Sequence, residues 1–200
     1  MDRKVVKLKP IAAIVVLLLV VASLLASGCI TNNTSNTNQT PSATTLPQNL
    51  PILSTGLEFP CIKATPNRTS VGIVTKVVDG DTIHVTINGT DYKVRYIGIN
   101  TPEDTTKKEP LGPEATERDK ELVAGKQVVL IKDVSETDKF GRLLRYVFID
   151  NVFVNYELVR EGYAEAKAYP PDISCKQTFY NAQLLAQQEH RGLWIVGSAS

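Results

Sequence analysis

Apolar and polar positions divide this chain into three zones. Positions 11–26 are apolar except for Ser23, whereas positions 30–51 contain few apolar residues and no charge. From position 70 onward, stretches with a period of two residues are followed by stretches with helix start and stop signals. We therefore predict an N-terminal leader, a spacer and one folded domain of ordinary size.

The folded domain is predicted to begin with a three-stranded meander. Positions 71–78 are rich in β-branched residues, and positions 82–87 alternate strictly between apolar and polar side chains. Asn88 and Gly89 form a strong hairpin signal directly after this alternation. Positions 92–99 are therefore predicted to be the third strand.

Helices and two further strands follow the meander. A helix is predicted to begin at Pro113, which a first helical turn tolerates, and to stop at Gly125. The remaining predicted elements are strands at 128–131 and 143–149 and helices at 155–161 and 176–190. This order favours an α+β fold dominated by β-structure, a five-stranded OB-fold barrel with about three helices. Periodicity alone does not separate this barrel from another α+β arrangement.

The leader has the features of a secretory signal. Positions 1–9 carry four basic residues, the apolar run follows, and small residues lead up to Cys29. We therefore expect positions 1–28 to be a signal sequence. The residues before Cys29 resemble the lipobox of prokaryotic lipoproteins, which implies cleavage before Cys29 and lipidation of its thiol.

An uncleaved membrane helix at the N-terminus is the alternative interpretation of the leader. The apolar run is at the short limit for spanning a bilayer, which takes roughly 17 residues or more. Both interpretations predict an exported protein that is attached to the outer face of the cell membrane.

Composition predicts how the rest of the chain is organised. Positions 29–69 are expected to form the lipidated cysteine and a flexible spacer rich in Asn and Thr, and positions 70–196 the folded domain. The first 28 residues take four basic and one acidic side chain, which leaves 18 basic and 20 acidic residues and a net charge of −2. Such a domain lacks the basic excess typical of nucleic-acid-binding proteins, so phosphate binding would need a metal ion and a few placed arginines.

Two cysteines remain once Cys29 is assigned to the lipid anchor. Cys61 and Cys175 form an even pair in an oxidising compartment, so a disulfide between them is expected, with two unpaired thiols as the alternative. A zinc site is not expected, because two cysteines and two distant histidines lack metal-ligand spacing.

Acidic residues at the end of the first predicted strand are the first candidates for chemistry. Asp79 and Asp81 lie two positions apart in VVDGDTI, so in an extended chain both side chains point the same way. Two like charges this close are costly unless a positive charge lies between them. A plain Asp-Gly turn between strands is the alternative.

Polar residues also gather where the third predicted strand ends, in VRYIGINTPE. Oxygen atoms from Asn100 and Thr101 would suit a hard cation such as Ca²⁺, and Glu103 could hold a water for attack on phosphorus. Arg95, within the strand, and Arg142, just before a later strand, could bind phosphate. The alternative for Arg95 is a solvated strand arginine, and the alternative for Arg142 is a loop arginine paired with Asp138.

Four segments in order carry a resemblance to a known family. VVDGDTI, VRYIGINTPE, GPEA and DKFGR are similar to the thermonuclease family, whose type member is staphylococcal nuclease, and the similarity covers roughly positions 71–194. The resemblance implies an OB-fold, Ca²⁺-dependent endonuclease that hydrolyses DNA and RNA. It also implies cleavage of the 5′ P–O bond, which leaves 3′-phosphate ends.

The resemblance assigns a role to each matching position. The two phosphate-clamping arginines and the water-activating carboxylate fall on Arg95, Arg142 and Glu103. The metal ligands fall on the Asp81 carboxylate, the Thr101 main-chain carbonyl and Asn100.

Asn100 departs from the family pattern, which has a second carboxylate at that position. The amide keeps one neutral oxygen but removes a full negative charge, so Ca²⁺ binding should be weaker. A non-catalytic OB-fold module that binds nucleic acid or protein is therefore the alternative function.

Further substrate contacts are expected around this site. Tyr169 resembles family aromatics that contact the base, and stacking of this kind favours single-stranded DNA and RNA. Lys107 and Lys108 follow Glu103 and could contact the nucleic-acid backbone, although both could equally be solvated. We expect the protein to be a monomer.

Overall fold

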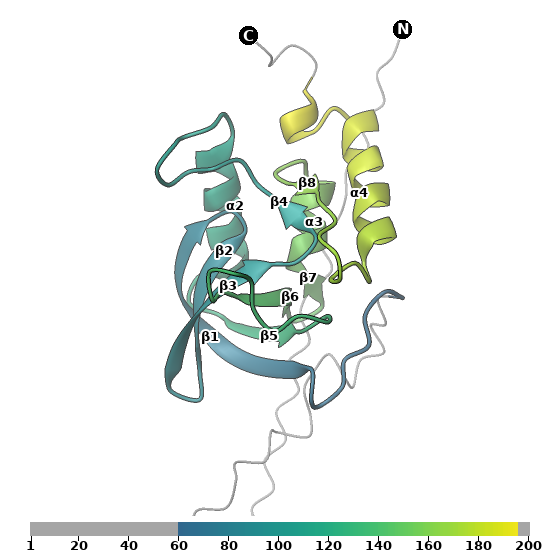
Figure 1. The fold of residues 1–200 in the computed structure, drawn as a ribbon. Helices are drawn as coiled ribbons and strands as arrows, with labels where there is room; N and C mark the ends of the chain where they lie inside the picture. Colours follow the sequence, from purple (N-terminus) through teal and green to yellow (C-terminus); the bar gives the residue numbers. More distant parts are fainter. Residues whose placement is uncertain (1–59, 196–200) are drawn as a thin grey trace, which may run out of the picture. The chain divides into compact units, whose positions relative to one another are not determined.

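A computed structural model describes residues 60–195 of the chain (Figure 1). The predicted signal sequence, the predicted lipidation site Cys29 and most of the predicted spacer lie outside the described residues. Among the helices of the described part, none has the length and apolar character that a bilayer crossing requires.

The described chain forms short strands and three α-helices in an order close to the predicted one. The strands are β1 (Thr69–Asp79), β2 (Thr82–Ile87), β3 (Thr90–Tyr96), β4 (Ile99–Asn100), β5 (Gln127–Ile131), β6 (Leu143–Ile149), β7 (Val152–Phe153) and β8 (Glu165–Ala166). The helices are α2 (Gly112–Val123), α3 (Val154–Arg160) and α4 (Lys176–Gln188), followed by the 3₁₀ turn η1 (Gly192–Trp194).

Five strands close into a barrel, which confirms the predicted OB fold. Strand order is β3-β2-β1-β5-β6, and an additional parallel pairing of β3 with β6 joins the two edges (Figure 1). In that pairing Val94 lies opposite Leu143 and Arg95 lies opposite Leu144. All other pairs within the barrel are antiparallel.

The barrel interior is filled by the apolar side of each strand. Ile83 and Val85, the alternating residues of β2, are fully buried, as are Val94 and Leu130 from neighbouring strands. Alternation places these side chains on one face, and closure of the sheet removes that face from water. Helices α3 and α4 pack outside the barrel, with Phe179 of α4 in the same core.

Gly98 ends the third strand earlier than predicted. It adopts a φ of +79°, a conformation that favours glycine, and a Cβ atom there would lie 2.4 Å from the ring of Phe179. β3 therefore ends at Tyr96. Ile99 and Asn100, which follow Gly98, form β4, which pairs with β8 so that Asn100 lies opposite Glu165.

A disulfide joins Cys61 to Cys175 across 114 positions of the sequence, with 4.9 Å between the Cα atoms. Cys175 is fully buried and lies in the core beside α4. The bond fixes the segment that precedes β1 to the loop that precedes α4.

Candidate active site

The Asp81 carboxylate is the buried centre of the candidate site. It lies where β1 turns into β2 and is only 4% exposed. One oxygen accepts a hydrogen bond from the main-chain N–H of Thr101 at 2.9 Å, and the other accepts one from the Thr82 hydroxyl at 3.1 Å. These bonds hold the end of β4 against the β1–β2 turn, so two of the three predicted metal ligands lie together.

Asp79 lies beside Asp81, and its surroundings disfavour its charged form. Burial, and then the negative charge of Asp81, raise the pKa of Asp79 to about 6. Gly80 allows this close turn, because a Cβ there would lie 2.9 Å from side-chain atoms of Ala115 and Thr101. Helix α2 therefore packs directly on the acidic turn.

Arg95 joins the predicted metal ligands to one another. Its guanidinium forms an ion pair with the Asp81 carboxylate and donates a 2.9 Å hydrogen bond to the Asn100 side-chain oxygen. The Arg95 side chain is 13% exposed, so it does not lie on a solvated face of the strand. It reaches from β3 into the space that Asp81 and Asn100 border.

Three residues beside the Arg95 guanidinium carry oxygen atoms that could ligate a metal ion. The Asn100 amide nitrogen donates to the Thr101 carbonyl at 3.2 Å, which places that carbonyl beside the Asp81 and Asn100 side chains. Carboxylate, amide and main-chain oxygens are the donors that hard cations such as Ca²⁺ prefer. Within residues 60–195, no three acidic, histidine or cysteine side chains cluster as metal ligands. A cation here would therefore depend on neutral oxygens and would compete with Arg95 for Asp81.

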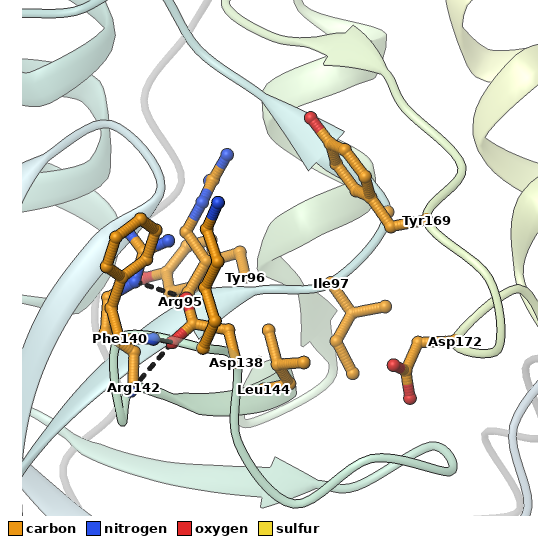
Figure 2. Close-up of a pocket in the computed structure, with 11 residues that line it drawn as sticks. Arg95, Tyr96, Ile97, Asp138, Phe140, Arg142, Leu144, Tyr169 and Asp172 are labelled. Atoms are coloured by element: carbon orange, nitrogen blue, oxygen red, sulfur yellow. Dashed lines mark hydrogen bonds and ion pairs between the residues drawn. The ribbon is translucent and has the colours of Figure 1, made fainter.

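Both predicted phosphate-binding arginines line one pocket of about 480 Å³ (Figure 2). The Arg142 Nε donates to the Asp138 carboxylate at 2.7 Å, and the guanidinium lies 5.5 Å from the centre of the Phe140 ring. The predicted alternative of a pair with Asp138 is thus observed, but it leaves Arg142 in the pocket beside Arg95. Positions 47 residues apart in sequence meet here because β3 and β6 are neighbours in the barrel.

Aromatic side chains stand on two sides of the same pocket. Figure 2 shows Phe140 on the side of Arg142 and Tyr169 on the opposite side. Both rings are open to solvent, with 72% of Phe140 and 51% of Tyr169 exposed. Such rings can stack on bases.

Phe140 and Lys139 are pocket residues that sequence reasoning missed. The Lys139 ammonium lies 5.0 Å from the centre of the Phe140 ring. The sequence does carry a signal for them, because the aromatic Phe140 lies between the basic residues Lys139 and Arg142. Such a combination is suited to binding a base and its phosphate.

Glu103 lies in the loop between β4 and α2, two positions after Thr101, and is exposed. Its carboxylate accepts one hydrogen bond within the described residues, from Thr105 at 3.4 Å. Its main chain is tied down more firmly, because the carbonyl accepts the N–H of Glu109 at 2.8 Å. The predicted role of Glu103 stays a prediction.

Lys107 and Lys108 border a second cavity of about 510 Å³, which Asn100 and Glu165 also line. The two ammonium groups are held loosely, at 3.9 Å from Glu109 and 3.6 Å from Asp104. Asn100 therefore lies between this cavity and the Arg95 guanidinium.

A buried acid lies behind the acidic turn. Asp119 of α2 is completely buried and accepts a 2.9 Å hydrogen bond from the Tyr96 hydroxyl. Burial raises the pKa of Asp119 well above its usual value, and the charges of Asp81 and Asp79 add to the effect.

Sequence comparison with known proteins identifies the family of this chain. A family model described as "Staphylococcal nuclease homologue" matches residues 93–196. Thermonuclease of Staphylococcus intermedius is 37% identical over 125 residues, which cover 61% of this chain and 74% of that protein. Two Bacillus subtilis proteins also match. The SPbeta prophage-derived endonuclease YokF is 40% identical over 126 residues (60% of this chain, 42% of that protein), and endonuclease YncB is 37% identical over 126 residues (60% and 59%).

Proposed function

The chain belongs to the staphylococcal nuclease family and is a nuclease, and from this premise we propose that it is a Ca²⁺-dependent endonuclease acting on both DNA and RNA. Cleavage at the 5′ P–O bond, with 3′-phosphate products, is part of the proposal and rests on the family resemblance. The observation that carries the proposal is the meeting of Arg95 and Arg142 in one pocket, beside the oxygens of Asp81, Asn100 and Thr101.

The two arginines bind the phosphodiester that is cut. Negative charge builds on the phosphoryl oxygens as water attacks, and fixed guanidiniums oppose that charge where it develops. A planar guanidinium can bind two phosphate oxygens at once. Arg95 exchanges its contacts with Asp81 and Asn100 for the phosphate, whereas Arg142 keeps its Nε on Asp138 and presents its remaining donors.

Asp81, Asn100 and Thr101 would hold the metal ion. Ca²⁺ bound by these oxygens would neutralise charge on a phosphoryl oxygen. The protein supplies a single full negative charge at this position, from Asp81, because Asn100 is neutral. We therefore propose a weak site that is filled at millimolar rather than micromolar Ca²⁺.

Glu103 accepts the proton of the attacking water. An ionised carboxylate is a suitable general base, and the Thr105 hydroxyl is a weak restraint on it. The Glu103 main-chain carbonyl accepts the Glu109 N–H, which fixes the backbone from which the side chain extends.

Two further groups would hold the parts of the substrate beyond the scissile phosphate. They are the aromatic pocket, by which we mean the pocket that Phe140 and Tyr169 share with Arg95 and Arg142, and two lysines. Phe140 and Tyr169 would stack on an unpaired base, which favours single strands. Lys107 and Lys108 would contact phosphates on the other side of Asn100.

Digestion of single-stranded DNA and RNA by the protein without its first 28 residues tests this function. Cutting is expected with Ca²⁺ and not with a chelator, and the products should carry 3′-phosphates. Arg142→Ala should lower kcat roughly 10²-fold or more, as loss of one oxyanion donor does. Cutting that ignores the chelator, or no cutting at any Ca²⁺ concentration, would overturn the proposal.

A binding module without catalysis is the second candidate function, and the neutral Asn100 favours it. Asn100→Asp places a second negative charge beside Asp81, so the variant should bind Ca²⁺ about tenfold more tightly than the wild type. Calorimetry measures this difference, which corresponds to roughly 1.4 kcal/mol of binding free energy. The matched control is Asn100→Ala, which removes the oxygen. If only Asn100→Asp cuts nucleic acid, the natural protein is a binder.

We propose further that a lipid on Cys29 attaches the protein to the outer face of the membrane and that the protein is monomeric. The support is the sequence pattern of positions 1–29. Mass spectrometry of the protein extracted from membranes should give a chain that begins at Cys29 and carries acyl groups, and light scattering should give a monomer mass. A mass that still includes positions 1–28 would instead support an uncleaved helix.

A further inference from the structure

Two loops without strand pairing to each other form the walls of the aromatic pocket. Residues 132–142, between β5 and β6, carry Phe140 and Arg142, and residues 167–175, between β8 and α4, carry Tyr169. The width of the pocket therefore depends on whatever joins these loops.

Asp172 joins the second loop to the base of the first. Its side chain is 5% exposed, and one carboxylate oxygen accepts the main-chain N–H groups of Val134 at 2.9 Å and Ser135 at 2.8 Å. The Asp172 main-chain N–H donates to the Tyr169 carbonyl at 3.0 Å. Asp172 thus contacts both the loop that carries Phe140 and the turn that carries Tyr169.

Asp133 makes the reciprocal connection from the first loop to the second. This carboxylate is also 5% exposed and accepts the Ser174 hydroxyl at 2.7 Å and the Ser174 main-chain N–H at 3.0 Å. It also accepts the Tyr146 hydroxyl at 2.9 Å from within the barrel wall and pairs with Arg68 at 3.3 Å. Each loop therefore contributes one buried carboxylate that accepts hydrogen bonds from the other loop.

Asp172 acts on the pocket by holding the two loops in position and not through its own charge. Asp172 lines the pocket, and Figure 2 shows it below Tyr169 on the same side. A carboxylate in the wall repels a phosphodiester, so its direct electrostatic effect on substrate is unfavourable. A buried charge of this kind is retained at low cost only because charge-assisted hydrogen bonds satisfy it.

We propose that Asp172 and Asp133 form a reciprocal clasp that fixes Tyr169 opposite Phe140 and so determines the affinity for the nucleobase. Asp172 is a positioning residue, and it acts on substrate through the two loops. The inference rests on the proposed function, because it concerns how the same site holds its substrate.

A pair of substitutions separates geometry from charge. Asp172→Asn removes the charge but keeps an oxygen that can accept both main-chain N–H groups, whereas Asp172→Ala removes the acceptor as well. Asp172→Ala should raise KM for single-stranded DNA, and Kd for a fluorescein-labelled DNA tetranucleotide in chelator, about tenfold. Its kcat should change less than about twofold, because Arg142 directly precedes β6 and the pairing of that strand with β3 fixes its backbone. Asp172→Asn should match the wild type or bind slightly more tightly.

Hydrogen exchange provides a readout that does not depend on cleavage. The amides of Val134 and Ser135 should exchange faster in Asp172→Ala and keep their protection in Asp172→Asn. Ser174→Ala, which removes one donor to Asp133, is the milder variant if Asp172→Ala does not fold. It should raise Kd in the same direction by a smaller factor.

Several outcomes would overturn the clasp. Equal Kd values for the alanine and asparagine variants would show that the hydrogen-bond acceptor at position 172 does not position the loops, and a fall in kcat without a rise in KM would place Asp172 in the chemistry. A wild-type protein that binds the tetranucleotide but does not cut would overturn the proposed nuclease mechanism while leaving the clasp testable by binding.

Discussion

Opening the Cys61–Cys175 disulfide should destabilise the folded domain strongly. The bond closes a loop of 114 residues, and the chain-entropy model assigns about 5 kcal/mol to a loop of that length. Removal of native disulfides typically costs roughly 2–5 kcal/mol. At roughly 4 °C per kcal/mol for a domain of this size, the melting temperature should fall by about 8–20 °C.

Cys61→Ala is the cleaner way to open the bond. Cys175 is fully buried, and a lone buried thiol packs as a small apolar group, so leaving it in place avoids a second packing change. A chain that begins after Cys29 contains only these two cysteines, which excludes exchange with a third thiol.

Calorimetry with and without dithiothreitol measures the effect. Reductant should lower the wild-type melting temperature to about that of Cys61→Ala and should leave the variant unchanged. If mass spectrometry shows the bond opened and the melting temperature is unaltered, the segment before β1 does not restrain the domain, and the loop-closure argument fails.

Further predictions concern the core and the pocket. Asp119→Asn should reduce the loss of stability as pH rises from 3.8 toward the raised pKa of Asp119. Its folded-state pKa is raised by burial, so the stability it contributes is complete below the ordinary value of 3.8 and is lost as pH rises toward the raised value; parallel melting curves for both proteins would refute this. Gly98→Ala should lower the melting temperature, because the new methyl group meets Phe179 in a backbone conformation that favours glycine; an unchanged value in thermal unfolding would contradict it. Phe140→Ala should raise KM for single strands with little change in kcat, and Phe140→Tyr, which keeps the ring, should not; kinetics that fail to distinguish these variants would exclude stacking.

Local pattern was sufficient to predict the strands of the barrel but not their interruptions. Alternation through Ile83 and Val85 and the Asn88-Gly89 turn each specify a strand or its end from neighbouring residues alone. The sequence does not mark Gly98 as a break, because the apolar residues on both sides continue the strand pattern and the close approach of Phe179 is a contact between distant positions. β4 and β8 are too short to leave any periodicity.

The candidate site could be predicted where chemistry resides in side-chain type and not where it depends on loop position. Asp81, Arg95 and Arg142 stand out as charges beside apolar strands, and the fold brings them together. Phe140 was missed because its position beside the arginines follows from the path of a loop. The hydrogen bonds of Asp172 to a distant loop have no counterpart in local sequence.

The parallel pairing of β3 with β6 has a consequence for when activity can arise. Arg95 and Arg142 are brought side by side only by the backbone hydrogen bonds that close the barrel. A nascent chain that has not yet supplied β6 has one arginine on an open sheet edge and no phosphate clamp. A chain that has not completed the barrel is therefore expected to lack nuclease activity until its last barrel strand has docked.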